Sequence, residues 1–142
     1  MISDSWWDDL PNLSEPPEWK LRVEQGVSSI VSALGIQALA AWSDDALCRV
    51  EEELLATFPR VDSPAVQRSS DYLQFIQYLG EGLAHDLNAK WIEFPEELSD
   101  LGEYGLYVES EHSLVPIEPL IHHAIDVRTG ATWLAAFAGS RR

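Results

Sequence analysis

Apolar residues recur three and four positions apart over three stretches of the first two thirds of the chain, at about 18–34, 44–58 and 63–87. This spacing puts the apolar side chains on one face of a helix, so each stretch is predicted to be an amphipathic helix. The third stretch contains Gly80 and Gly82, which either let another part of the chain approach closely or interrupt the helix.

The pattern changes after the third helix. Short segments at 89–94, 104–110 and 112–117 are typical of antiparallel strands, the last two forming a hairpin, and helical spacing returns at 118–128 and 131–138. Helices, then a small antiparallel sheet, then helices again predict an α+β fold, with N-terminal helices packed on the sheet and C-terminal helices following it.

The first 17 residues differ from the rest because they carry acids and three prolines without any regular spacing. We therefore expect an irregular acidic and aromatic arm at 1–17, followed by a single α+β domain at 18–142. Two adjacent large rings in this arm, Trp6 and Trp7, have two interpretations. Either a ring docks on the protein's own core and ties the arm down, or the pair anchors a partner.

Charge is the unusual property of the composition. Twenty-four Asp and Glu stand against nine Lys and Arg, a formal net charge of −15. Such a chain repels nucleic-acid backbones and anionic membrane surfaces, whereas it favours rapid capture of a basic protein. The alternative is that the acidity only keeps the protein in solution. Cys48 is the single cysteine, which excludes an internal disulfide and fits a reducing compartment. The sequence shows no signal-peptide pattern and no apolar run long enough to span a membrane, so we expect a cytoplasmic protein.

The acids concentrate in the predicted sheet region. Residues 81–118 hold ten acids and one base, Lys90, a net charge of −9. Acids interleaved with aromatic rings can form a patch for Lys-rich and Arg-rich surfaces. The alternative is a solvated rim with its rings turned inward. The candidate partner-binding residues are Glu93, Glu96, Glu97, Asp100, Glu103, Tyr104, Tyr107, Glu109 and Glu111, together with Trp6 and Trp7.

Candidate chemistry is sparse. Glu118, His122 and Asp126 stand four positions apart on the predicted 118–128 helix, a row that either holds a divalent ion loosely or is exposed to water as charged helix surface. The triplet Glu51–Glu53 is expected to be a solvated face. No nucleophile elbow or phosphate-binding loop is present, so we predict a protein without catalysis, cofactor or metal.

The order "FIQYLGEGLAHDLNAKWIEFP", "YGLYVE" and "VPIEPLIHHAI", with Gly80, Trp91 and Pro116, resembles small acidic bacterial immunity-type proteins over about residues 72–128. The resemblance implies a protein that covers and inhibits a basic toxin. We therefore expect a monomeric, non-catalytic domain that engages and inhibits a basic protein partner. Two alternatives stay open: a dimeric secretion chaperone, and a metal-dependent enzyme that uses Glu118, His122 and Asp126.

Overall fold

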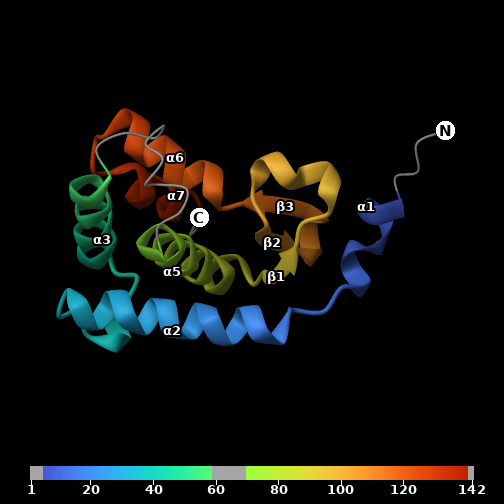
Figure 1. Ribbon diagram of the computed structural model, residues 1–142, viewed down its shortest axis with the longest axis horizontal. Coiled ribbons are helices and arrows are strands. Elements are labelled where there is room, and N and C mark those ends of the chain that lie inside the picture. The colour runs from blue at the N-terminus through green and yellow to red at the C-terminus, as the bar shows by residue number, and fades with distance from the viewer. Residues whose placement is uncertain (1–4, 59–69, 141–142) are drawn as a thin grey trace.

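The computed structural model describes residues 5–58 and 70–140 and has the predicted α+β fold (Figure 1). Its main elements are α1 (Ser5–Asp9), α2 (Pro17–Ala33), α3 (Asp44–Thr57), α5 (Ser70–Leu87), β1 (Lys90–Glu93), β2 (Tyr104–Val108), β3 (Ser113–Pro116), α6 (Glu118–Val127) and α7 (Thr132–Ser140). Short 3-10 turns, η1 (Leu10–Asn12), η2 (Ala38–Ala40), η3 (Glu96–Leu101) and η4 (Glu109–Glu111), join them. No helix in the described ranges is long and apolar enough to cross a membrane.

The first helices begin and end at residues that favour helix ends. Pro17 opens α2, and the chain leaves it through Gly35, whose φ of +65° suits a residue without a Cβ atom. The Ser43 hydroxyl accepts a hydrogen bond from the backbone N–H of Ala46, which caps α3. The predicted start of the third helix, near residue 63, lies outside the described residues.

Helix α5 is the central element, and it runs unbroken through both of its glycines (Figure 1). A Cβ atom on Gly80 would lie 2.1 Å from Cη2 of Trp91, and one on Gly82 would lie 2.4 Å from Cδ1 of Trp42. The two glycines therefore leave space for two tryptophan rings. Of the two expectations for these glycines, close approach of another part of the chain is the one observed, and the helix is not interrupted. The packing of the rings offsets the lower helix propensity of glycine.

The sheet has the order β1-β2-β3 and is antiparallel throughout, and β2 and β3 form the predicted hairpin. Because side chains alternate along a strand, Trp91 and Leu106 face α5 and the main core, whereas Ile92 and Tyr107 face the opposite side. Both faces of this small sheet are therefore buried.

The second face of the sheet is covered by the N-terminal segment. Here the expectation of an irregular arm is wrong in part, because residues 5–9 form α1 and Leu10 in η1 is fully buried. This short helix places Trp6, Trp7 and Leu10 where they pack on Ile92, Phe94 and Tyr107. We call the apolar cluster on this face of the sheet the second cluster. The segment is also tied by polar contacts, since the Glu15 carboxylate accepts the Trp91 N–H and Lys90 donates to the Leu13 carbonyl.

The C-terminal helices close the other end of the core and correct a second expectation. Glu51 in α3 is not solvated: it is fully buried, and its carboxylate accepts the backbone N–H groups of Thr132 (3.1 Å) and Trp133 (2.8 Å). These N–H groups belong to the first turn of α7 and have no partner within that helix. Glu51 is thus an N-terminal cap supplied from another helix, and its neighbours Glu52 and Glu53 are exposed as expected.

Candidate functional site

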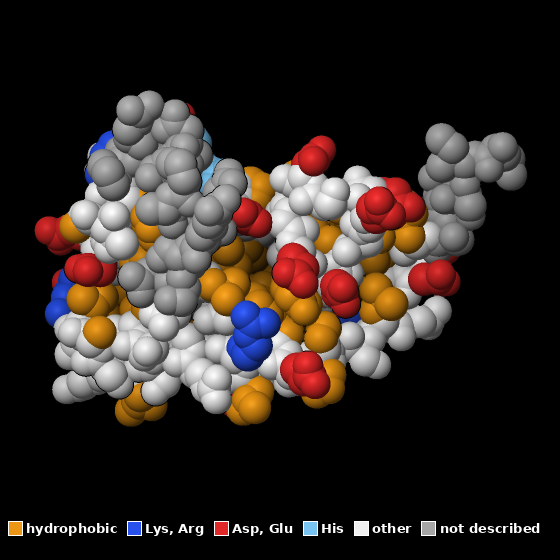
Figure 2. All heavy atoms as spheres, in the orientation of Figure 1, with side chains coloured by type: hydrophobic (Ala, Val, Ile, Leu, Met, Phe, Trp, Pro, Cys, Tyr) orange, Lys and Arg blue, Asp and Glu red, His pale blue; other side chains and the backbone are white. Residues whose placement is uncertain are grey.

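Five exposed carboxylates lie around the connection between β1 and β2. Glu93 ends β1, Glu103 precedes β2, and the others lie on η3, which packs Leu98 and Leu101 against the second cluster and leaves its acids exposed. We call this group the η3 acidic edge: Glu93, Glu96, Glu97, Asp100 and Glu103. On the face shown in Figure 2, acidic side chains gather over the sheet half of the molecule, where Lys and Arg are sparse.

The carboxylates of the η3 acidic edge are not neutralised within the protein. None of the five forms an ion pair with a residue in the ranges 5–58 and 70–140. Lys90, the base of the acidic stretch, instead donates to backbone carbonyls of the N-terminal segment, and its ammonium lies 5.7 Å from the centre of the Tyr107 ring. The charge of the edge is therefore directed at solvent.

The two remaining candidate acids lie elsewhere. Glu109 and Glu111 are exposed on η4, the connection between β2 and β3, at the opposite end of β2 from the acidic edge. A strand of this length separates the two groups by about 15 Å. The structure thus divides the predicted patch into two groups of unequal charge, and the η3 acidic edge is the larger.

The interleaved aromatic rings turn inward, so the predicted mixture of acids and exposed rings is not formed. Tyr107 is 1% exposed and its hydroxyl hydrogen-bonds Nδ1 of His112 at 2.6 Å, which excludes its ring from partner contact. Tyr104 is half-buried and stacks on Trp19, with ring centres 4.0 Å apart. Burial raises the pKa of Tyr104, and the carboxylates of Glu103 and Glu93 raise that pKa further.

The tryptophan pair follows the first of its two interpretations. Both rings are half-buried against the second cluster, Trp6 meets Trp7 edge to face at 5.8 Å, and Trp7 lies 4.3 Å from the His112 ring. These contacts fasten the N-terminal segment to the η4 end of the sheet.

Glu118, His122 and Asp126 lie in different surroundings on α6. The Tyr72 hydroxyl donates to Glu118, whose carboxylate is 3.9 Å from Nε2 of His122, while His123 and Asp126 are exposed. No group of three metal-binding side chains is found in the part of the chain that the structure describes. The helix positions Ile121, Ala124 and Ile125 toward the core, as its spacing predicts.

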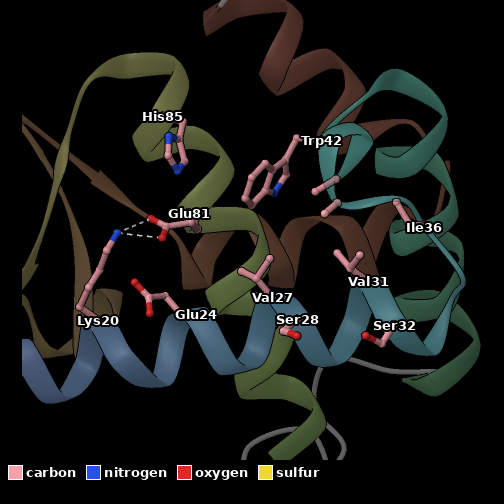
Figure 3. Close-up of a pocket in the computed structure, with 12 residues that line it drawn as sticks. Lys20, Glu24, Val27, Ser28, Val31, Ser32, Ile36, Trp42, Glu81 and His85 are labelled. Atoms are coloured by element: carbon pink, nitrogen blue, oxygen red, sulfur yellow. Dashed lines mark hydrogen bonds and ion pairs between the residues drawn. The ribbon is translucent and has the colours of Figure 1, made fainter.

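A groove that the sequence did not reveal runs between α2 and α5 and ends at η2 (Figure 3). We call it the α2–α5 groove; it has a volume of about 670 Å³. Its apolar lining comes from Val27 and Val31 of α2 and from Ile36, Ala41 and Trp42 of the following connection. Trp42 is held in place by Gly82 beneath it and by a 2.9 Å hydrogen bond from its Nε1 to the Tyr78 carbonyl.

One end of the groove is charged. The Lys20 ammonium binds both carboxylate oxygens of Glu81, at 2.9 and 2.8 Å, and Glu81 is 6% exposed. The indole N–H of Trp91 also donates to Glu81, at 3.4 Å. In Figure 3 Glu24 and His85 point toward this pair from the next turns of α2 and α5.

Helical spacing puts both Val27 and Val31 on the apolar stripe of α2, and it does not distinguish the buried Val31 from Val27, which is half-buried and lines the groove. One feature of the sequence could have indicated the groove. Glu81 lies between Gly80 and Gly82 in the apolar part of α5, where a charged residue is not expected unless it has a partner. No family model, curated protein or solved structure matches the chain, so the functional argument depends on this geometry.

Proposed function

We propose that this protein is a non-catalytic binding domain that captures a basic protein and inhibits it by covering its surface, as an immunity or antitoxin-like protein does. The observation that carries the proposal is the η3 acidic edge, five exposed carboxylates without an ion-pair partner among the described residues. Repulsion among unpaired like charges costs stability, and a cationic partner would relieve it.

The proposal also includes a monomeric state and a cytoplasmic location. A formal net charge of −15 raises the encounter rate with a basic protein and opposes association of two copies, so the free protein is proposed to be a monomer. Cys48 is a free thiol, which fits the reducing cytoplasm. Light scattering that gives a dimer mass would instead favour a chaperone.

The test begins with affinity capture from the source cells, identification of the bound protein, and its purification. Its association rate is then measured from about 50 to about 500 mM salt, where screening of exposed charges becomes strong. We expect the rate to fall steeply with salt. A rate that is indifferent to salt contradicts capture by charge.

Two charge-matched variants locate the binding surface. Glu96→Gln/Glu97→Gln/Asp100→Asn removes three charges from the acidic edge, and Asp45→Asn/Glu52→Gln/Glu53→Gln removes three exposed charges from α3. The first variant is expected to slow association about tenfold and the second no more than about twofold. Equal slowing would mean that overall charge, and not the η3 acidic edge, attracts the partner.

A further inference from the structure

The α2–α5 groove presents apolar surface that the described part of the protein does not cover. Val27 and Trp42 are half-buried and supply most of it, whereas Val31, Ile36 and Ala41 form the buried floor of the groove. Large apolar side chains that fill such pockets contribute most of the binding energy at protein interfaces.

The charged end of the groove favours a positively charged ligand group. The pair formed by Lys20 and Glu81 cancels its own charge, and Glu24 forms no ion pair with a described residue. The hydroxyl of Ser28 and the carboxylate of Glu24 are acceptors on the same wall. With histidine counted as neutral, Lys20, Glu24, Glu81 and His85 leave this end of the groove with a net charge of −1, so an ammonium or guanidinium group would gain a charge-assisted hydrogen bond to Glu24.

We infer that the α2–α5 groove receives an amphipathic segment of the basic partner, with apolar side chains against Val27 and Trp42 and a Lys or Arg beside Glu24. The inference rests on the proposed function, to which it adds a second contact of defined chemistry. A second copy of the chain is a poor occupant, because two molecules of charge −15 repel each other. A small amine would pair with Glu24 but leave the exposed parts of Val27 and Trp42 in contact with water.

The probe is a capped synthetic peptide of about 14 residues made of Leu, Lys and Ala, with leucines three and four positions apart so that a helix presents them on one face. Binding to the full chain is followed by NMR through the indole N–H of Trp42, which donates to the Tyr78 carbonyl in the groove wall. We expect saturable shifts of the Trp42 indole and of the backbone amides of Val27 and Val31.

Matched variants test the location. Ser28→Trp places a ring from an exposed position into the groove, while Ser29→Trp places the same ring on α2 outside the groove lining. Ser28→Trp is expected to weaken peptide binding at least about tenfold, and Ser29→Trp no more than about twofold.

The charge requirement is tested with Glu24→Gln, expected to weaken binding about threefold, against Glu52→Gln on α3, expected to leave it unchanged. A peptide with serine in place of leucine keeps the charge and is expected not to bind the groove. Equal binding of the serine peptide overturns the inference. So does equal binding of hexylamine, or a Ser28-dependent dimer of the free chain.

The acidic-edge variant separates this inference from the proposed function. If Glu96→Gln/Glu97→Gln/Asp100→Asn abolishes peptide binding while Ser28→Trp does not, the groove inference fails and capture by the edge stands. If the purified partner associates at a salt-independent rate but the peptide still fills the groove, the proposed function fails and the groove remains a binding site.

Discussion

Two groups of carboxylates in this protein have the same chemistry and opposite surroundings. Glu51 and Glu81 are buried, and each is held by donors: Glu51 by two backbone N–H groups and Glu81 by Lys20 and the indole of Trp91. The carboxylates of the η3 acidic edge are exposed and have no described cationic partner. Glu51 and its exposed neighbour Glu52 belong to different groups although they are adjacent in the chain.

The acids of this very acidic protein therefore fall into two groups, those that support the fold and those that are exposed to solvent. A buried carboxylate is tolerated only when donors replace the water it loses, so Glu51 and Glu81 stabilise the fold. An exposed carboxylate needs no such partner and adds little to stability. The exposed group is therefore free to be used for binding.

The largest effect is expected at Glu51. Glu51→Ala removes two charge-assisted hydrogen bonds to the first turn of α7, each worth about 1.5 kcal/mol, so the free energy of unfolding should fall by about 3 kcal/mol. Glu52→Ala, one residue along the same helix, should change it by no more than about 0.5 kcal/mol. Urea unfolding followed by fluorescence measures both. Similar losses in the two variants would show that the buried position of Glu51 is unimportant.

The next effect is expected at the ion pair between Lys20 and Glu81. Lys20→Met leaves Glu81 buried beside apolar groups and should cost about 2 kcal/mol, a value lowered because Lys20 is partly exposed. Adding Glu81→Gln removes the unpaired charge, so the double variant should be more stable than Lys20→Met alone. Thermal unfolding of the single and double variants compares their stabilities. If the stability losses of the two substitutions simply add, Lys20 and Glu81 do not interact energetically.

Alkaline pH extends the comparison to buried tyrosines. Burial raises the pKa of Tyr72, which the carboxylate of Glu118 raises further, and burial alone raises the pKa of Tyr78. Above pH 10 the unfolded chain loses these protons while the folded chain keeps them, so stability falls as pH rises. The expected slope is about 1.4 kcal/mol per pH unit for each tyrosine.

The variant Tyr72→Phe/Tyr78→Phe should remove most of this alkaline slope. It should also be less stable at neutral pH, because both hydroxyls donate hydrogen bonds, Tyr72 to Glu118 and Tyr78 to the Ala41 carbonyl. Urea unfolding at pH values between about 9 and 11.5 gives the slopes. An unchanged slope in the double variant would assign the alkaline loss to other groups.

The smallest effect on stability is expected at the acidic edge. Glu96→Gln/Glu97→Gln/Asp100→Asn should leave the free energy of unfolding within about 0.5 kcal/mol of the parent, or raise it slightly by relieving repulsion. The same variant is expected to slow capture of a basic partner. A stability loss of more than about 1.5 kcal/mol would show that these carboxylates, like Glu51 and Glu81, stabilise the fold.

Much of the fold was predictable because local signals and packing agree. Ser43, Pro17 and Gly35 are residue types that favour helix ends, and they lie at the ends of α3 and α2. The alternation of Trp91 and Ile92 matches two buried faces of a sheet. The acidic edge was predictable in part: its five acids were candidates, but Tyr107 was wrongly expected at the surface. Alternation places Tyr107 on the second face of β2, and the docked N-terminal segment together with Leu98 and Leu101 of η3 buries that face.

Helix spacing, strand alternation and composition are local properties, so the element order, the α+β class and the strongly negative charge can be read from the chain alone. Contacts between distant parts of the chain set which carboxylates are buried, which rings turn inward, and where α2, Trp42 and α5 enclose a groove. Glu51 shows the reason most clearly. Its donors come from Thr132 and Trp133, some eighty positions away, and no pattern within α3 specifies which N–H groups will meet it.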